Sequence, residues 1–557
     1  MDVNTRKEYE RWLNDSPLTK EEKESLLAIQ NDEEAINDAF YRDLSFGTAG
    51  LRGVLGMGTN RMNVYVVMKA TQGLANYLNK NYRNASVAIA YDSRHFSTEF
   101  GKIAAKVLSS NGIKAYIYDV LKPTPVLSYT VRNLHCQAGI MVTASHNPAK
   151  YNGYKVYGDD GCQITDHFAD MVSKEINALD IFKDIKCDDD SLVESVPERV
   201  YQEFLASTMK VSLLDKSVSR DIKIAFTPLN GTGRYPVQDI LRMGGFKNVS
   251  IVKEQEEPDG DFPTCTYPNP ELRPTLELGV KLLEEIKGDI LIATDPDCDR
   301  VALASRDEDG VHYYSGNETG MLLFDYVYNT LKTRDLLPKH PVLVKTIVST
   351  DLMNVICDKL GVQCVEVLTG FKYIGEVIAN LEKEDRKEDF LLGFEESCGY
   401  LTNTDVRDKD AVNASMLVAE MVAFNKANGK SVHQRIEEIY KEYGRYQSVV
   451  DSYEFPGQSG KAKMDDLMKY FRESEVDFPI GKAVTVNDYL LSVSKTGNES
   501  KEIKLPKSNV MKYIFEDGTT VTVRPSGTEP KIKIYYCGKD ENVIKQLKQF
   551  MDNITNK

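Results

Sequence analysis

"VAIAYDSRHFSTEFGKIAAKVLSSNGIKAYIYD", residues 87–119, contains the pattern that decides the fold. An apolar run is followed by a polar turn, an amphipathic segment that ends near a glycine, and a second apolar run. This order predicts a strand, a crossover helix and a parallel strand, joined with right-handed connectivity. The same pattern returns in "IKIAFTPLNGTGRYPVQDILRMGGFKNVSIVK", residues 222–253, and in "VLVKTIVSTDLMNVICDKLGVQCVEVL", residues 342–368.

The spacing of these copies predicts three α/β domains of similar plan, because each copy begins more than 100 residues after the previous one. The alternative is one large doubly wound sheet. The tail differs: residues 509–538 alternate like antiparallel strands with a hairpin turn at 517–518, and residues 541–551 are typical of a helix. We therefore expect a smaller C-terminal α+β domain and the division 1–208, 209–313, 314–440 and 441–557, with a helical arm over the first 45 residues.

Composition restricts the function. The 557 residues carry a net charge of −15, without the basic excess that nucleic-acid binders show. No apolar run approaches the length of a membrane span, and the charged N-terminus does not resemble a secretory signal. Nine cysteines are scattered without a CxxC motif, which favours free thiols over disulfides or zinc. We expect a cytoplasmic protein that binds neither nucleic acid nor membrane.

A candidate metal loop lies in "GDILIATDPDCDRVALASRD", residues 288–307. An apolar strand ends in three carboxylates, Asp295, Asp297 and Asp299, which would repel one another without a shared cation. An EF-hand is excluded because its glycine and glutamate positions hold Arg300 and Arg306. The loop predicts a Mg²⁺ site with open positions for a phosphate oxygen, and the alternative is a solvated acidic turn.

Three further loops offer groups for an anionic sugar. "VRPSGTEPKIK", residues 523–533, combines a guanidinium, hydroxyls and a glycine N–H that together suit a phosphate dianion, unless the segment is only a turn. "GFEESCGY", residues 393–400, places two carboxylates and a serine after an apolar run, where they can accept hydrogen bonds from sugar hydroxyls. "LTGFKYIGE", residues 368–376, lies between a predicted strand and helix, the usual ligand position in open α/β sheets.

A candidate nucleophile occurs in "GIMVTASHNPAKYNGYKVYG", residues 139–158, where Ser145 precedes His146. The chain has no G-x-S-x-G motif, which argues against a serine hydrolase. Because neighbouring side chains usually diverge, we expect His146 to point away from Ser145 rather than serve as its base. The same chain contains the aspartate loop and the candidate phosphate-binding segment 523–533. Phosphorus is therefore a more fitting electrophile for Ser145 than carbon.

Together these motifs resemble the α-D-phosphohexomutase superfamily. TASHNP with YNGYK, DPDCDR, FEES, RPSGTEP and also FGTAGLRG (46–53) occur in the order typical of that superfamily and span residues 46–533. The N-terminal arm and the tail are most similar to the phosphoglucomutase branch, which includes phosphoglucomutase/phosphopentomutase enzymes. The resemblance implies three α/β domains with mixed sheets and a C-terminal domain of the TATA-binding-protein-like kind around a central cleft.

The resemblance also implies site residues. Those expected to act in catalysis are Ser145, His146, Lys155, Lys409 and Arg52. Those expected to bind substrate are Arg300, Thr369, Gly370, Lys372, Glu395, Ser397, Arg524, Ser526, Gly527 and Thr528. The expected metal ligands are Asp295, Asp297, Asp299 and an oxygen of phosphorylated Ser145. One departure is Tyr400, where phosphomannomutase-type members carry a histidine; the Lys409-Asp410 pair resembles the phosphoglucomutase type instead.

The implied reaction converts glucose 1-phosphate to glucose 6-phosphate and back, with Mg²⁺, phosphoserine at Ser145 and glucose 1,6-bisphosphate as intermediate and activator. Lys155 or Lys409 would be the general acid/base, with a pKa lowered by nearby cations. His146 would either orient Ser145 or hydrogen bond the turn. Phosphopentomutase, phosphomannomutase, glucosamine-phosphate mutase, bisphosphate synthase and phosphatase activities remain alternatives, as does a non-catalytic relative that binds sugar phosphates. Monomer and dimer also remain open.

Overall fold

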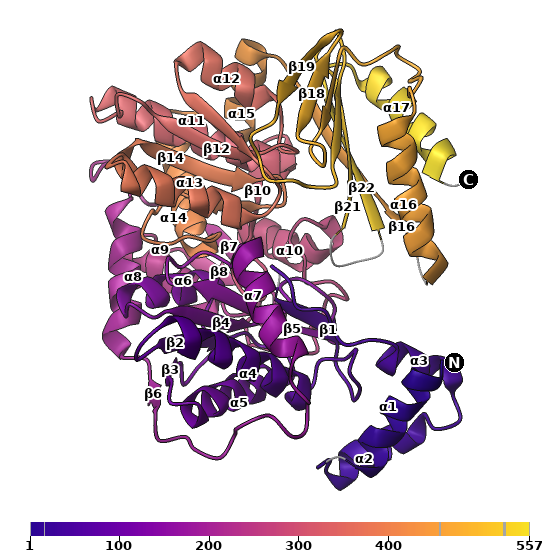
Figure 1. The fold of residues 1–557 in the computed structure, drawn as a ribbon. Coiled ribbons are helices and arrows are strands. Elements are labelled where there is room, and N and C mark those ends of the chain that lie inside the picture. The colour runs from indigo at the N-terminus through magenta and orange to yellow at the C-terminus, as the bar shows by residue number, and fades with distance from the viewer. Residues whose placement is uncertain (1, 16, 49, 456–457, 527–530, 556–557) are drawn as a thin grey trace.

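The chain forms several separate sheets. The computed structural model describes residues 2–15, 17–48, 50–455, 458–526 and 531–555, and within these ranges the strands form four sheets (Figure 1). Each of the three repeats quoted above contributes a parallel pair of strands to its own sheet. The prediction of separate α/β domains is thereby confirmed, and the single doubly wound sheet is excluded.

Domain I contains a six-stranded mixed sheet in the order β1-β5-β4-β2-β3-β6. Strands β4, β2, β3 and β6 are parallel, whereas β5 and β1 pair antiparallel at one edge. The strands are β1 (Leu51–Val54), β2 (Ser86–Tyr91), β3 (Lys114–Ile117), β4 (Ala138–Val142), β5 (Tyr151–Gly158) and β6 (Val193–Ser195). The helices are α4 (Val64–Asn81), α5 (Ser97–Ser110), α6 (Thr124–Asn133), α7 (Asp166–Asn177) and α8 (Glu198–Lys210).

Domain II has a five-stranded mixed sheet in the order β11-β10-β9-β7-β8. Its strands are β7 (Ile224–Thr227), β8 (Val249–Ile251), β9 (Ile290–Thr294), β10 (Val301–Asp307) and β11 (Gly310–Tyr314). Its helices are α9 (Arg234–Met243) and α10 (Glu277–Glu285), with short 3₁₀ turns η1 (Lys253–Gln255) and η2 (Arg273–Leu276).

Domain III has a four-stranded mixed sheet in the order β13-β12-β14-β15. Its strands are β12 (Val342–Thr346), β13 (Gln363–Val367), β14 (Phe390–Glu395) and β15 (Gly399–Leu401). Its helices are α11 (Gly316–Thr333), α12 (Leu352–Leu360), α13 (Phe371–Lys383), α14 (Ala411–Ala427) and α15 (Val432–Tyr443), with the 3₁₀ turn η3 (Lys387–Asp389).

Domain IV is built differently, as the tail predicted. Its seven strands pair antiparallel in the order β16-β22-β21-β20-β17-β18-β19. They are β16 (Gln447–Glu454), β17 (Thr485–Asp488), β18 (Val493–Thr496), β19 (Glu499–Glu502), β20 (Met511–Ile514), β21 (Thr520–Pro525) and β22 (Lys531–Gly538). Helices α16 (Gln458–Glu473) and α17 (Glu541–Thr555) lie together beside this sheet (Figure 1).

The N-terminal arm packs on domain I around an aromatic cluster that includes Trp12. The arm contains α1 (Val3–Asn14), α2 (Lys20–Ala28) and α3 (Glu33–Phe40), and the capping box Thr19–Glu22 begins α2. Trp12 is fully buried, and its ring meets Phe40 edge-on at 5.7 Å and Phe182 of domain I at 5.2 Å. Such aromatic contacts add to the apolar burial that fixes the arm in place.

The hydrophobic cores show which domains pack against one another. One continuous apolar cluster joins residues of domains I, II and III, and domain IV has a separate cluster of its own. The boundaries proposed from the sequence at 208, 313 and 441 fall inside α8, β11 and α15 respectively. Across the described residues, none of the helices combines the length and the apolar character that crossing a bilayer requires.

Candidate active site

The loop that carries Ser145 joins β4 to β5 and adopts an unusual backbone. Ser145 has φ +53°, in the left-handed region that a non-glycine residue adopts at a cost, often at functional sites. This conformation turns its Oγ toward His146 Nδ1, at 3.2 Å, and toward Asp295 Oδ2 of domain II, at 3.1 Å. The expectation that the neighbouring side chains of Ser145 and His146 diverge is therefore wrong, because in this backbone conformation Ser145 Oγ lies beside the His146 ring.

Strand β5 packs closely against this loop and pairs with β1. Gly153 of the YNGYK segment makes the approach possible: a Cβ there would lie 2.5 Å from the Thr143 carbonyl oxygen. In β1, Arg52 pairs with Gly153 in register and donates from Nη1 to Asn147 Oδ1 at 3.2 Å. The predicted residue Arg52 thus contacts the serine loop.

Arg94 holds the serine loop in shape, and sequence reasoning missed it. Its guanidinium is buried and donates to four main-chain carbonyls of the loop, those of Ser145, Asn147, Pro148 and Tyr151. The carboxylate of Asp92 lies 3.3 Å from Arg94 Nε and accepts from Thr143 at 2.6 Å. The segment "DSR", residues 92–94, directly follows strand β2, and this position was the available signal.

The Arg94→Lys variant is expected to lose about 10²-fold in kcat, because a lysine cannot bond several carbonyls at once and small displacements of reacting groups are costly. Enzymatic turnover and the occupancy of the phosphoryl group expected on Ser145, determined by mass spectrometry, measure this effect. Arg42→Lys is the control, since Arg42 is exposed and bonds Asn60 at 3.2 Å. A variant that melts and turns over like the wild type would show that the loop needs no Arg94.

The three aspartates lie in the loop between β9 and β10 and are fully buried. One carboxylate oxygen of each lies within 4.8 Å of the others, so one ion could contact all three. A second loop supports them: Gly231 packs so closely that a Cβ there would lie 2.4 Å from Pro296 Cα, and Thr232 Oγ1 donates to the Pro296 carbonyl at 3.0 Å. The solvated acidic turn is thereby excluded.

The aspartate oxygens fit a hard divalent cation. Among the described residues, Asp297 Oδ1 and Asp299 Oδ1 are buried without a hydrogen-bond partner. Burial and the neighbouring carboxylates raise the pKa of Asp295 well above its usual range and raise that of Asp299. Buried, mutually repelling carboxylates with unused oxygens are compensated by a cation such as Mg²⁺.

Two lysines neutralise part of this negative charge. Lys155 Nζ lies 2.9 Å from Asp297 Oδ2, and Lys409 Nζ lies 3.2 Å from Asp299 Oδ2 and 3.1 Å from Asp408 Oδ1. Burial alone would lower the pKa of both lysines, but these carboxylates outweigh it and raise them. The expected lowering of the lysine pKa by nearby cations is therefore wrong, because the closest charges are carboxylates.

Thr124 and Glu271 are further partners that sequence reasoning missed. Thr124, at the start of α6, donates from Oγ1 to Asp297 Oδ2 at 3.0 Å. Glu271 forms an ion pair with Arg300, whose Nη1 also donates to the Ser397 carbonyl at 3.2 Å. Arg300 thus connects the aspartate loop of domain II to the loop of domain III that holds Ser397.

His146 is partly buried and lies among cations. Burial and the charges of Arg300 and Arg52 hold its pKa well below the usual value. This lowered pKa favours the neutral imidazole, whose Nδ1 lies beside Ser145 Oγ. Lys533 of β22 is another of the cations that lower this pKa, which places domain IV near the serine loop.

The predicted sugar-binding residues gather in domain III. Glu395 ends β14 and accepts from the Gly370 N–H at 2.8 Å, while Thr369 Oγ1 is buried without a described partner. Lys372 lies in the first turn of α13 with Nζ 3.1 Å from Asp166 Oδ1 of domain I. Tyr400, at the position of the histidine expected in phosphomannomutase-type members, is buried and donates to the Gly316 carbonyl at 3.1 Å. This contact is within the core of domain III.

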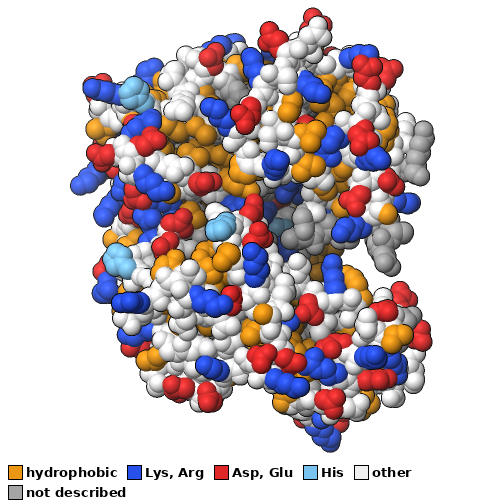
Figure 2. All heavy atoms as spheres, in the orientation of Figure 1, with side chains coloured by type: hydrophobic (Ala, Val, Ile, Leu, Met, Phe, Trp, Pro, Cys, Tyr) orange, Lys and Arg blue, Asp and Glu red, His pale blue; other side chains and the backbone are white. Residues whose placement is uncertain are grey.

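The predicted phosphate loop follows β21 in domain IV. Arg524 Nη1 donates to Tyr535 OH at 3.4 Å, and the Ser526 N–H donates to the Lys531 carbonyl at 2.8 Å. Gly527 and Thr528 lie outside the described residues. The surface is hollowed between domain I and domain IV, with Lys and Arg side chains at its edge (Figure 2).

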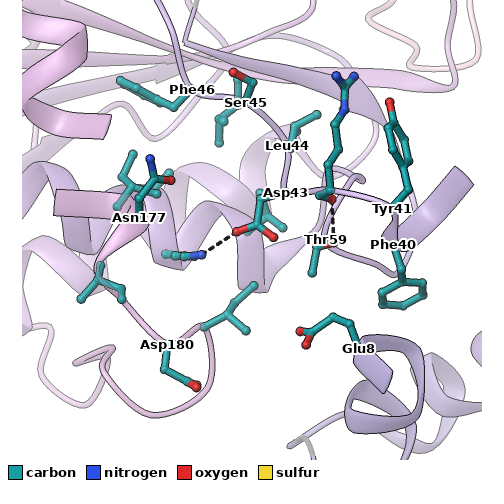
Figure 3. A pocket seen from close by; sticks show the side chains of 18 of the residues that line it. Glu8, Phe40, Tyr41, Asp43, Leu44, Ser45, Phe46, Thr59, Asn177 and Asp180 are labelled. Carbon is teal, nitrogen blue, oxygen red and sulfur yellow. Dashed lines mark hydrogen bonds and ion pairs between the residues drawn. The ribbon is translucent and has the colours of Figure 1, made fainter. Parts of the chain in front are cut away.

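A separate pocket of about 640 Å³ lies between the arm and domain I (Figure 3). Phe40 and Glu8 line it from the arm, and Asp180 and Asn177 line it from domain I, whereas none of the predicted site residues does. Its charges neutralise one another through the Arg11–Asp180 pair at 2.7 Å and the Lys69–Asp43 pair at 2.8 Å. This pocket is therefore separate from the site formed by the aspartate loop.

Comparisons with known proteins agree with this arrangement. The description "Phosphoglucomutase/phosphomannomutase, alpha/beta/alpha domain" I, II and III matches residues 43–181, 199–310 and 315–443, and the C-terminal domain of that family matches residues 473–554. A phosphoglucomutase of Staphylococcus haemolyticus is 38% identical over 523 residues, which cover 92% of this chain and 93% of that protein. One of Staphylococcus aureus is 37% identical over 515 residues, 91% of each chain.

The fold is likewise similar to that of pp63/parafusin, a phosphoglucomutase of Paramecium in its open form, with a TM-score of 0.67 and 20% identity over 93% of this chain and 95% of that one. The domain order, the aspartate loop and the serine loop thus occur together in a chain that matches one family along nearly its whole length. The chain belongs to the phosphoglucomutase/phosphomannomutase family, and it is an enzyme of the phosphoglucomutase branch.

Proposed function

We propose that this enzyme interconverts glucose 1-phosphate and glucose 6-phosphate through phosphorylated Ser145 and a bound glucose 1,6-bisphosphate. One observation carries the proposal: Ser145 Oγ of domain I lies 3.1 Å from Asp295 Oδ2 of domain II. A hydroxyl at the edge of a carboxylate cluster suits phosphoryl transfer, in which positioning and charge stabilisation supply most of the rate.

Asp295, Asp297, Asp299 and a phosphoserine oxygen would hold Mg²⁺, which withdraws charge from the phosphoryl group when bound. In the first half-reaction, the sugar 6-hydroxyl oxygen bonds to phosphorus as the bond from phosphorus to Ser145 Oγ breaks. A proton leaves the sugar hydroxyl and one arrives at Ser145 Oγ, so the step is balanced. Lys155 and Lys409, whose pKa values are raised by the nearby carboxylates, would donate these protons, and His146, whose pKa is lowered, would accept them.

In the second half-reaction, the bisphosphate presents its other end and returns the 1-phosphate to Ser145. The site must then accept the sugar in two orientations. Glu395 and Ser397 would bind adjacent hydroxyls in either orientation, supported by Thr369, Gly370 and Lys372. Arg524 and Ser526 would grip the phosphate that does not react, with Gly527 and Thr528 proposed from the sequence alone, while Arg52 and Arg300 would neutralise the phosphate near Ser145.

The test is a parallel assay of glucose 1-phosphate, mannose 1-phosphate and ribose 1-phosphate, with and without added glucose 1,6-bisphosphate. We expect the highest kcat/KM for glucose 1-phosphate and stimulation by the bisphosphate. A higher value for mannose or ribose 1-phosphate would make the enzyme a phosphomannomutase or phosphopentomutase. Release of phosphate without isomer would indicate a phosphatase, and binding without conversion a non-catalytic relative.

We also propose that the enzyme works in the cytoplasm. All nine cysteines are free thiols, the state that a reducing compartment maintains.

A further inference from the structure

Two cysteines of domain III lie against each other. Cys357 is in the last turns of α12 and Cys364 is at the start of β13, in the segment "CDKLGVQC". Gly361, with φ +70°, ends the helix, and the Val362 N–H donates to the Cys357 carbonyl at 2.9 Å, which turns the chain back. This turn brings Cys364 back against α12, where Asn354, the residue that bonds its Sγ at 3.1 Å, precedes Cys357 by three residues on the same helix face.

The sheet register fixes the surroundings of Cys364. It pairs with Leu343 of β12, and two residues further Glu366 pairs with Lys345, so all four side chains belong to one face of the sheet. Helix α12 contacts this face: Asn354 Oδ1 accepts from Cys364 Sγ at 3.1 Å, and Asn354 Nδ2 donates to Glu366 at 3.4 Å. Because β13 is an edge strand, Cys364 is partly exposed, whereas Cys357 is buried.

The two thiols differ in their chemistry. The interaction with Cys357 and the charge of Lys345 lower the pKa of the Cys364 thiol, whereas the same interaction and burial raise that of Cys357. Cys364 is thus the partly exposed thiol, on the same sheet face as the cation Lys345, and Cys357 is the neighbouring buried thiol. A nucleophilic thiol beside a resolving thiol is the arrangement found in redox-sensing cysteine pairs.

We propose that Cys364 and Cys357 form a reversible disulfide in response to hydrogen peroxide. The Cys364 thiolate sulfur bonds to one peroxide oxygen as the O–O bond breaks, which gives a sulfenic acid and hydroxide. Cys357 then loses its proton, its sulfur bonds to Cys364 Sγ, and the S–O bond breaks with release of a second hydroxide. Each hydroxide takes up a proton, so two thiols are oxidised while one peroxide is reduced to two waters.

The pair lies beside the ion network that holds domain IV on domain III. Lys345 Nζ is 2.7 Å from Glu366 Oε1, and Asp351, at the start of α12, accepts from Lys512 Nζ of β20 at 2.9 Å. Thr520 of β21 also donates to Asp351, at 2.7 Å. Disulfide formation removes the bond from Cys364 to Asn354 and pulls on α12, the helix that begins at Asp351. Oxidation should therefore disturb the docking of domain IV.

The chemical step is tested without any activity assay. The full-length enzyme is treated with graded hydrogen peroxide, and peptides are mapped by mass spectrometry. We expect the Cys357–Cys364 disulfide at lower peroxide than any oxidation of Cys265, which is also partly exposed but has its thiol pKa raised by burial. Cys265→Ser should behave as the wild type, and Cys357→Ser should instead retain a sulfenic acid at Cys364 that dimedone traps.

Earlier oxidation of Cys265, or the absence of the Cys357–Cys364 disulfide at any peroxide concentration that leaves the fold intact, would overturn the proposal. The effect on domain IV rests on the proposed function and is measured separately. Oxidised enzyme should show a KM for sugar phosphate raised about fivefold or more, restored by dithiothreitol and absent in Cys364→Ser. A disulfide without any KM change would refute the link to domain IV while leaving the mutase assignment untouched.

Discussion

Replacing Ser145 with alanine is expected to reduce mutase turnover by at least about 10⁴-fold, the scale of loss seen when a covalent nucleophile is removed. The Oγ atom bonds only to His146 and Asp295 among the described contacts, so its loss deletes the phosphoryl acceptor without opening the core. Sugar binding should persist, because the groups proposed to hold the sugar lie in domain III. The measurements are kcat with glucose 1-phosphate and the phosphoryl adduct on the intact protein by mass spectrometry.

The matched control is Ser305→Ala, which removes a buried hydroxyl 2.7 Å from Tyr314 OH in domain II, away from the aspartate loop. This variant should keep wild-type turnover and its phosphoryl adduct. Wild-type turnover in Ser145→Ala would show that another group accepts the phosphoryl group. A phosphoryl adduct that persists in Ser145→Ala would identify the residue that carries it.

The sequence allowed the architecture to be predicted because each domain contains its own local signal. The strand-helix-strand repeats gave the parallel cores, and the turn at 517–518 correctly joins β20 to β21. What the repeats could not give is the packing between domains. The continuous core across domains I, II and III depends on contacts such as those of α14 with α9, which are distant in sequence.

In the candidate site, the reasoning found the residues that lie next to recognisable turns and missed those that act from a distance. Asp295, Asp297 and Asp299 follow an apolar strand and could be recognised together. Thr124 and Glu271 contact Asp297 and Arg300 only after folding, and each is separated from its partner by intervening elements. No local pattern marks such residues.

Two predictions at the site were wrong: the orientation of His146 relative to Ser145, and the direction of the lysine pKa shift. The first depends on backbone conformation, and the second on the balance of nearby charges. The left-handed φ of Ser145 cannot be inferred from the residue type, yet it decides whether Oγ meets His146. Counting the lysines and arginines near Lys155 suggested a lowered pKa, but the balance depends on the distance to Asp297. Only the folded geometry shows that the carboxylates are closer than the cations.

Asp297→Asn is expected to lower kcat by about 10²- to 10³-fold, the scale of removing one preorganised charge from a transition state. Asp297 is the informative choice of the three aspartates. Its Oδ1 has no hydrogen-bond partner among the described residues, whereas Asp295 Oδ1 accepts from the Asp299 and Arg300 N–H groups and so holds the loop itself. The asparagine can still accept from Thr124, which bonds Oδ2 at 3.0 Å in the wild type.

The metal dependence separates a lost ligand from a damaged loop. Chelation with EDTA should abolish wild-type turnover, and added Mg²⁺ should restore it with saturation. In Asp297→Asn the Mg²⁺ concentration for half-maximal rate should rise, and calorimetric binding of Mn²⁺ should weaken in parallel, because one anionic oxygen ligand has become a neutral amide. Asp307→Asn, whose carboxylate bonds His312 and Ser431 outside the loop, should change neither. If Asp297→Asn bound Mn²⁺ as tightly as the wild type, the trio would hold something other than the ion, because a carboxylate that ligates a divalent cation cannot lose its charge without cost to affinity.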